Sequence, residues 1–230
     1  MTSAALVRVR SNRRATPTTR LIQVDLSSRP VPFTAGQWMR LGPPGEDDPR
    51  PYSIASSPGE SRAHRLLEFL VRDEGSGAGV AGLPRGTPVR LEGPHGRFHL
   101  PEPFVEGDAL FIAGGTGIAP LRSMLMHALA QPRHPRCSVL YSARAADEFA
   151  YRTELRQLAA AGRITLALTI TGIVRGRWKG PRGRITHAQL AAMRPTPETL
   201  CLVCGPPGFV SDVRLALAEL GVARVRSEEQ

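Results

Sequence analysis

The chain has 230 residues, of which 41% are hydrophobic and 22% are charged, and its formal net charge is +10 at pH 7. This length fits one large domain or two small ones, and the composition excludes a disordered chain. No apolar run approaches the roughly 20 residues of a membrane-spanning helix. Aromatic residues make up only 5% of the chain, and no basic run is interleaved with them. We therefore predict that neither a membrane nor a nucleic acid is a partner.

The positive charge of the chain bears on its partner, and its cysteines bear on its compartment. A net charge of +10 is typical either of a solvated basic surface or of a protein that steers an acidic partner toward itself. The three cysteines, Cys137, Cys201 and Cys204, are too few for a disulfide framework and indicate a reducing, cytoplasmic compartment. Cys201 and Cys204 form a lone CxxC, whereas a closed zinc or iron–sulfur site needs about four ligands. We predict no metal site.

Up to about Pro103 the sequence consists of short extended segments separated by Gly and Pro. Strands at this spacing, with little helical pattern, predict a small antiparallel β-barrel. The basic N-terminus lacks the apolar core of an export signal and alternates as a half-buried strand does. The expected strands are 5–10, 19–26, 37–41, 51–56, 66–72 and 87–93.

From Asp108 onward, continuous apolar strands alternate with helical patterns. This alternation implies right-handed crossovers and a parallel sheet covered by helices. The sequence therefore predicts two domains, a β-barrel over 1–104 and an α/β domain over 105–230. The expected strands are 109–115, 137–143, 163–170 and 199–205, with 223–226 as a candidate edge strand, and the expected helices are 116–130, 147–160 and 207–221.

Two glycine-rich turns follow strands of the expected parallel sheet. "IAGGTGIAP" (112–120) lies where the first strand turns into the first helix, and "CGPPGF" (204–209) follows the fourth strand. Glycines in the first turn would let the backbone approach a pyrophosphate at the helix N-terminus. The pattern departs from the dinucleotide fingerprint because Pro120 stands where its third glycine would be. A nucleotide site and simple turn chemistry both remain open on the glycines alone.

The end of the second parallel strand bears on the choice of nucleotide. Ser142 and Arg144 stand there, and Asp147 and Glu148 follow a little later. A 2′-phosphate favours arginine, whereas a free ribose 2′-hydroxyl favours an acid. The sequence therefore favours NADPH over NADH, with Arg144 on a solvated loop as the alternative.

The segment "RPYSIASSP" (50–58) brings an arginine, an aromatic residue and hydroxyl groups into one short extended stretch. A guanidinium can fork onto a phosphate, a phenol ring can cover a flat heterocycle, and a hydroxyl can reach the polar edge of that ring. The segment is therefore a candidate binding edge as well as a strand.

Four segments together, "RPYSIASSP", "GPHGRF", "IAGGTGIAP" and "VCGPPGF", resemble the ferredoxin–NADP⁺ reductase superfamily of flavoproteins and occur in its order. The resemblance implies a flavin, FAD with FMN as the alternative, bound by the barrel. It implies that Arg50 binds flavin phosphate, Tyr52 stacks on the isoalloxazine, and Ser53 lies near the ring nitrogen that exchanges hydride. The remaining flavin-binding residues that it implies are Pro51, Phe69, Val71, Ser76, Gly77 and Ala78.

The same resemblance implies that a nicotinamide dinucleotide binds to the α/β domain. Its implied ligands are Gly115, Thr116, Gly117, Ser142, Arg144, Cys204, Gly205 and Pro206. Ser53 and Cys204 would be the catalytic residues, beside the flavin and the nicotinamide. Cys204 as a small buried apolar residue is the alternative.

The chain departs from the family pattern in two places. Where the second phosphate-binding turn usually carries a hydroxyl after glycine, "DEGSGAGVAGLPRG" (73–86) has Gly77, preceded by Ser76, which leaves FAD and FMN open. The chain ends "ARVRSEEQ", without the terminal aromatic of plant-type members, so we expect the nicotinamide to reach the flavin without displacing a stacked ring.

The function implied is that of an NAD(P)H oxidoreductase that passes electrons through FAD to a one-electron carrier, such as an acidic ferredoxin. Two alternatives stay open, a free-standing NAD(P)H:flavin reductase and a non-catalytic electron-transfer subunit of a larger complex. Hydride transfer would need positioning more than acid–base chemistry, because the cofactors carry the reactivity.

Overall fold

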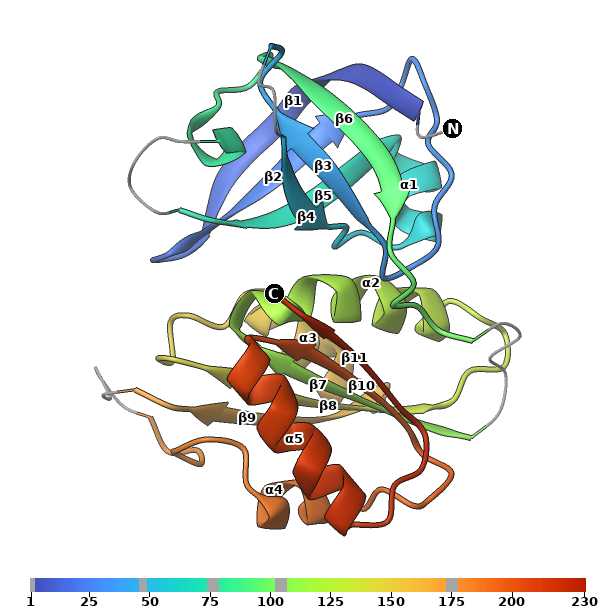
Figure 1. The fold of residues 1–230 in the computed structure, drawn as a ribbon, viewed down its shortest axis with the longest axis vertical. Helices are drawn as coiled ribbons and strands as arrows, with labels where there is room; N and C mark the ends of the chain where they lie inside the picture. The colour runs from blue at the N-terminus through green and yellow to red at the C-terminus, as the bar shows by residue number, and fades with distance from the viewer. Residues whose placement is uncertain (1–2, 46–48, 74–78, 102–106, 173–177) are drawn as a thin grey trace.

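The computed structural model describes residues 3–45, 49–73, 79–101, 107–172 and 178–230. Two units are stacked, with the N-terminal sheet above and the α/β unit below, and helix α2 (Ile118–Leu129) lies where they meet (Figure 1). The expected domain boundary at 104/105 lies outside the described residues. No helix in the described part of the chain is long and apolar enough to cross a membrane.

The N-terminal unit is a six-stranded antiparallel sheet with the strand order β4-β3-β6-β1-β2-β5. An isolated antiparallel bridge between Ile54 and Phe69 joins the two outer strands and closes the barrel. The barrel core contains fully buried Ile22, Leu41 and Leu91, so the expected antiparallel barrel is confirmed. The strands are β1 (Ser3–Thr16), β2 (Thr19–Asp25), β3 (Trp38–Gly42), β4 (Arg50–Ser53), β5 (Leu66–Arg72) and β6 (Pro88–His95).

The barrel carries a helix that the periodicity of the sequence does not predict. Helix α1 (Pro58–His64) begins at Ser57, whose hydroxyl accepts a hydrogen bond from the Glu60 N–H while the Glu60 carboxylate accepts one from the Ser57 N–H. This capping box and the proline at the first position start a helix that is too short to show an apolar period. A 3₁₀ turn, η1 (Gly79–Gly82), precedes β6.

The C-terminal unit is a five-stranded parallel sheet with the order β11-β10-β7-β8-β9. The expected parallel sheet is confirmed. The candidate edge strand at 223–226 corresponds to β11, which pairs with β10. Helix α4 is a second short helix with a capping box, here between Thr186 and Gln189, that the periodicity does not predict. The strands are β7 (Asp108–Gly114), β8 (Arg136–Ala143), β9 (Ile164–Ile170), β10 (Leu200–Gly205) and β11 (Val225–Glu229), and the further helices are α3 (Arg152–Ala160), α4 (His187–Ala192) and α5 (Pro207–Glu219).

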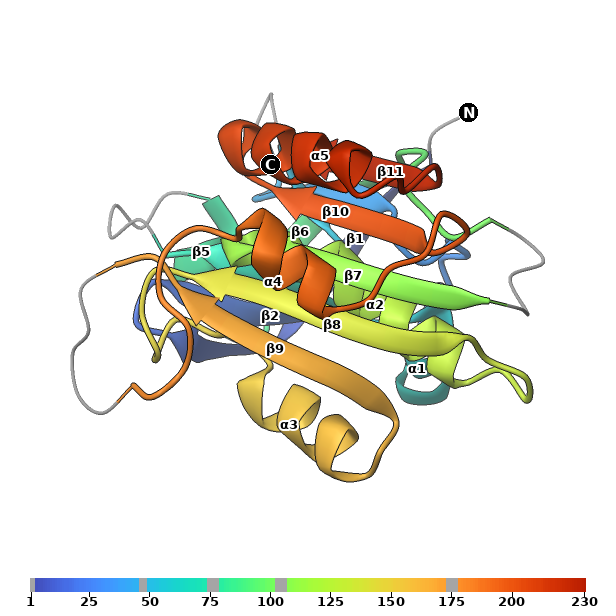
Figure 2. The ribbon, with the colours of Figure 1, turned by 90° about the horizontal axis from the view of Figure 1, so that it is seen from below.

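The helices cover both faces of the parallel sheet. Seen from below, α4 lies in front of the sheet and α2 behind it (Figure 2). Residues of α2 and α3 pack in one buried cluster with Phe111 and Val139, whereas residues of α4 and α5 pack in another with Ile112 and Val203. Since neighbouring side chains of a strand point to opposite faces, a continuous apolar strand such as β7 supplies both clusters.

Candidate functional site at the junction of the two units

Strand β4 lines a cavity of about 480 Å³ that lies between the barrel and the α/β unit. On the barrel side, the predicted flavin-binding residues Arg50, Pro51, Tyr52 and Ser53 line it. On the other side it is lined by Thr116 and by the end of β11. Its volume falls within the range typical of ligand pockets, roughly 300–1,000 Å³. A guanidinium, an aromatic ring and a hydroxyl therefore converge on one cavity, as a phosphorylated heterocycle requires.

The end of the chain contacts this cavity directly, which the sequence does not predict. The Nε2 group of Gln230 donates a 2.7 Å hydrogen bond to the Ser53 hydroxyl oxygen, and the Gln230 N–H donates to the Gly205 carbonyl at 3.0 Å. Glu228 and Glu229 line the same cavity. Burial raises the pKa of Glu228 to about 7, so this carboxyl group holds a proton over part of the neutral range.

The predicted dinucleotide turn approaches another strand so closely that only glycine fits. Gly115 and Gly117 belong to a 3₁₀ turn, η2 (Gly115–Gly117), that leads directly into α2. Gly115 has a φ of +57°, and a Cβ added at Gly117 would lie 2.2 Å from the Cys204 carbonyl oxygen. Turn and strand end therefore meet at the carboxyl edge of the sheet, where ligands of parallel sheets bind.

Two further cavities extend from this turn. One of about 230 Å³ is lined by Gly115, Thr116 and Arg144, and the Gly115 carbonyl accepts a 3.0 Å hydrogen bond from the Tyr141 hydroxyl. The other, of about 510 Å³, is lined by Gly115, Ser142, Arg144 and Pro206, together with Phe209 and Arg184. The structure therefore brings the predicted nucleotide-binding residues of β7, β8 and β10 to one edge.

Arg72 is a site residue that the sequence analysis missed. Its side chain lines the 480 Å³ cavity and both cavities at the glycine turn. Arg72 and its neighbour Leu70 face the site, whereas the predicted residues Phe69 and Val71 are buried in the barrel core. Successive side chains of a strand alternate between its two faces. A prediction that is wrong by one residue along β5 therefore selects core residues in place of residues that line the cavity.

Three more predicted residues lie outside the part of the chain that the structure describes, and Cys204, like Phe69 and Val71, is buried in a core. Ser76, Gly77 and Ala78 lie outside the described residues. Cys204 is fully buried, with 0% exposure, and burial raises the pKa of its thiol well above the ordinary value. Its neighbour Gly205 lies against the Phe209 ring, where an added Cβ would be 2.7 Å from Cδ1. The Cys204 carbonyl therefore lies directly against Gly117, and its side chain is buried in the core.

Among the residues that the structure describes, no three His, Cys, Asp or Glu side chains gather as metal ligands would. The donor set instead fits anionic, aromatic cofactors. Arg50 and Tyr52 supply charge and a ring face in the 480 Å³ cavity, and Arg72 and Arg144 supply charge in the two cavities at the glycine turn.

Known proteins resemble this chain in sequence and in fold. A family model described as an oxidoreductase NAD-binding domain matches residues 111–215. The ferredoxin–NADP reductase B of Sorangium cellulosum is 39% identical over 207 residues, which are 84% of this chain and 82% of that protein. The anthranilate 1,2-dioxygenase electron transfer component of Acinetobacter baylyi is 30% identical over 213 residues, and this chain spans only 60% of its length.

A solved structure supports the fold across the whole chain. It is a ferredoxin NADP⁺ reductase from Neisseria gonorrhoeae, determined with bound FAD and NADP. The TM-score is 0.79, and the match covers 98% of each chain at 23% sequence identity.

Proposed function

The chain belongs to the ferredoxin–NADP⁺ reductase superfamily of flavoproteins, and from this premise we propose that it is an oxidoreductase that moves electrons from NAD(P)H through bound FAD to a one-electron carrier. One observation carries the proposal. The cavity lined by the flavin segment and the cavities at the glycine turn share Arg72, and the flavin cavity also shares Thr116 with one of them. A flavin and a nicotinamide bound there would meet.

The barrel residues would bind and orient the flavin. Arg50 would hold a phosphate, Tyr52 would cover the ring, and Ser53 would donate a hydrogen bond to the ring edge. Gln230 supports the role of Ser53, because a donor on the hydroxyl oxygen leaves the hydroxyl hydrogen directed elsewhere. When bound, FAD supplies the chemistry of the site, since it accepts a hydride from NAD(P)H and passes electrons on one at a time.

The α/β residues would hold the dinucleotide. Gly115, Thr116 and Gly117 would accept the pyrophosphate at the start of α2, where N–H groups and the helix dipole favour anions. Arg72 would add a guanidinium to the same phosphates. The nicotinamide would pack against the chain at Cys204, Gly205 and Pro206. Cys204 would shape this surface through its backbone, which lies against Gly117.

Among the two nicotinamide coenzymes, the site supports NADPH. Arg144 and Ser142 line the 510 Å³ cavity, where a 2′-phosphate would find a guanidinium and a hydroxyl. Of the two acids near this strand end, Asp147 and Glu148, the second is already engaged. The Glu148 carboxylate accepts hydrogen bonds from the hydroxyls of Thr16 at 2.9 Å and Thr18 at 2.6 Å.

The electron acceptor that fits this protein is an acidic one-electron carrier such as a ferredoxin. A net charge of +10 supports electrostatic steering of such a partner. The buried, unpaired thiols of Cys137, Cys201 and Cys204 support a reducing compartment such as the cytoplasm.

The test is an absorbance spectrum of the purified chain, repeated without oxygen after addition of NADPH and, on a fresh sample, of NADH. A flavin spectrum that bleaches faster with NADPH is the expected result. A chain that takes up neither FAD nor FMN contradicts the proposal.

A further inference from the structure

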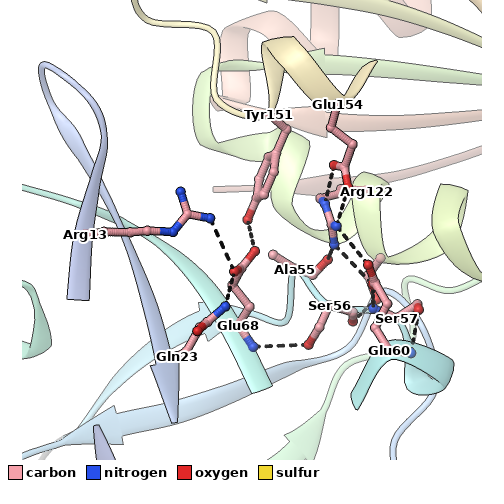
Figure 3. A network of polar contacts seen from close by, with 11 residues as sticks. Arg13, Gln23, Ala55, Ser56, Ser57, Glu60, Glu68, Arg122, Tyr151 and Glu154 are labelled. Atoms are coloured by element: carbon pink, nitrogen blue, oxygen red, sulfur yellow. Dashed lines mark hydrogen bonds and ion pairs between the residues drawn. The ribbon is translucent and has the colours of Figure 1, made fainter. Parts of the chain in front are cut away.

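Arg122 is a buried arginine outside the three cavities that joins the two units. Its side chain, 8% exposed, leaves α2 of the α/β unit and enters a polar network with residues of the barrel (Figure 3). The guanidinium donates to the Ala55 carbonyl at 2.8 Å, to both Glu60 oxygens at 3.2 and 2.9 Å, and to both Glu154 oxygens at 2.7 and 2.6 Å. It also stacks on the Tyr151 ring, 4.8 Å from the centroid.

The partners of Arg122 offset the cost of burying its charge. Burial alone lowers the pKa of Arg122, but the hydrogen bonds to Glu154 and Glu60 and the charge of Glu154 outweigh it and raise that pKa above the ordinary value. Burial likewise raises the pKa of Glu60, and the hydrogen bonds and charge of Arg122 outweigh it in the other direction. Replacing such a cluster with apolar side chains is often neutral or stabilising, so its best-attested use is to fix one arrangement of parts.

The parts that it fixes are those that carry the two cofactor segments. Ala55 lies two residues after Ser53, and the next carbonyl, that of Ser56, accepts a 2.7 Å hydrogen bond from the Ser123 hydroxyl. Arg122 itself lies five residues after Gly117 in the helix that the glycine turn begins. Both contacts are made to backbone carbonyls, so they locate the chain that continues β4 and not only its side chains.

A second arm of the network ties strand β5 to the same unit. The Tyr151 hydroxyl donates to Glu68 at 3.0 Å, and Gln23 donates to the other Glu68 oxygen at 2.8 Å. Glu68 lies two residues before Leu70, which lines the 480 Å³ cavity. The chain after β4 is thus bonded to α2, and β5 is bonded to Tyr151, the residue that precedes α3 (Figure 3).

We propose that Arg122 is a positioning residue for hydride transfer, because its bonds to the chain after Ser53 set the spacing between the flavin segment and the glycine turn. This inference rests on the proposed function. Hydride transfer requires the reacting atoms about 3–3.5 Å apart, and a misplacement of 1 Å can lower the rate about 100-fold. A residue that only anchored the fold would change the melting temperature and leave the rate per bound flavin unchanged.

The test compares Arg122→Lys with wild type by two independent measurements. The first is the rate of flavin reduction by saturating NADPH in a stopped-flow experiment, expressed per bound flavin and made well below the melting temperature of each variant. We expect at least a tenfold lower rate, with flavin retention and the Kd for NADPH within about twofold of wild type.

The second measurement needs no turnover. Spin labels at Leu6→Cys in the barrel and Leu215→Cys in α5 occupy exposed positions, 66% and 65% exposed, whereas the native thiols are buried. Pulsed electron resonance on the flavin-loaded chain then gives the distance distribution between the two units. We expect one narrow distribution in the wild-type background and a broader or shifted one with Arg122→Lys.

A matched control removes a different arginine ion pair. Arg136→Met breaks the bonds to Asp108 at 2.8 and 2.7 Å, which lie within the α/β unit on its surface, and both readouts should stay at the wild-type value. Should Arg122→Lys fail to fold, Ser123→Ala removes only the bond to the Ser56 carbonyl and is expected to lower the rate about threefold.

Each outcome decides the proposal. A slower rate together with a changed distance distribution supports it. A changed distance with an unchanged rate, or a slower rate with an unchanged distance, overturns it. Wild-type protein that binds flavin but is reduced by neither nucleotide would refute the proposed function and with it the positioning role, while the distance measurement would still report whether Arg122 joins the two units.

Discussion

Gln230 and Ser53 are joined by a 2.7 Å hydrogen bond from the glutamine amide to the serine hydroxyl, across 177 positions of sequence. The bond links the end of the α/β unit to the strand proposed to carry the flavin. Because the oxygen of Ser53 accepts this bond, its hydroxyl hydrogen is left for a different acceptor, and Ser53 lines the cavity between the two units.

Replacing either residue of this pair should slow hydride transfer, and replacing Ser53 should slow it more. Ser53→Ala removes the donor itself, and we expect the rate of flavin reduction to fall about tenfold. Gln230→Ala removes only the group that orients the donor, and since one neutral hydrogen bond contributes about 1 kcal/mol, we expect a loss of up to about fivefold. Stopped-flow reduction by NADPH measures both. A Gln230→Ala rate equal to wild type would show that the bond does not orient Ser53.

Tyr52 should determine how tightly the flavin is held. Tyr52→Ala removes a stacked ring face, and stacking of a heterocycle on an aromatic side chain is worth about 1–3 kcal/mol. We expect flavin affinity to fall at least fivefold, measured as the flavin retained after gel filtration at low protein concentration. Tyr52→Phe keeps the face and serves as the control. If the alanine variant stays fully yellow, Tyr52 does not stack on the flavin.

Arg144 should discriminate between the coenzymes. A hydrogen bond to a charged group contributes about 1.5–3 kcal/mol, so Arg144→Ala should raise the KM for NADPH at least tenfold and leave the KM for NADH within about twofold. Steady-state kinetics with both coenzymes measures the split. Arg136→Ala, at the opposite end of β8 from Arg144, controls for the loss of one positive charge. Equal effects on the two coenzymes would remove the proposed contact to the 2′-phosphate.

Glu228 should make stability depend on pH near neutrality. Burial raises its folded-state pKa to about 7, whereas the unfolded value is about 4.3. An acid with a raised folded-state pKa binds its proton more tightly when folded. Its contribution is therefore fully present below about pH 4 and is lost as the pH rises through about 7. The measurement is thermal unfolding of the flavin-free chain at pH 5 and at pH 8. We expect the melting temperature of Glu228→Gln, compared with that of wild type, to be higher at pH 8 than at pH 5.

The neighbouring residue supplies the control for that measurement. Glu229 lines the same cavity but is exposed, so Glu229→Gln should keep the pH dependence of wild type. Identical pH dependence in wild type and Glu228→Gln would exclude a raised pKa at Glu228.

Gly117 should tolerate no side chain. An added Cβ would lie 2.2 Å from the Cys204 carbonyl oxygen and 2.8 Å from the Gly205 nitrogen, both backbone atoms that cannot turn aside. Gly117→Ala should therefore lower the free energy of unfolding by about 3 kcal/mol or more, measured by denaturant titration. Gly208→Ala, where nothing lies within 4 Å of the added atom, should be close to neutral. Similar values for the two variants would contradict the close approach.

The two-unit fold was predictable because each unit has a clear period in its sequence. Alternating residues such as those of β2 and continuous apolar strands such as β7 distinguish an antiparallel barrel from a parallel sheet. The short helices α1 and α4 were not predicted, since six or seven residues cannot show a helical period. Their signals were local ones, "SPGE" at 57–60 and "THAQ" at 186–189, and both form capping boxes.

The place of a candidate residue in the structure was predictable where its type was tied to a turn or a strand end, as for Gly117 and Arg144. The sequence did not predict which side chains of a strand face the cavity and which face the barrel core. Arg72 and Phe69 lie on the same strand, but only the closed barrel determines which of them faces the cavity. Gln230 and Arg122 reach their partners across the interface between the units, and no pattern within one segment reports a contact of that kind.

The Arg122 network also limits how proteins of this design can exchange parts. Its members are divided between the halves, with Glu60, Glu68 and the Ala55 carbonyl in the barrel and Arg122, Tyr151 and Glu154 in the α/β unit. A chimera that combined this barrel with an α/β unit lacking the arginine would bring the partly buried Glu60 carboxylate to the junction without its counter-ion. The barrel and the α/β unit are therefore distinct in architecture, but neither can be replaced alone. A chimeric reductase would have to keep the side chains of this network together.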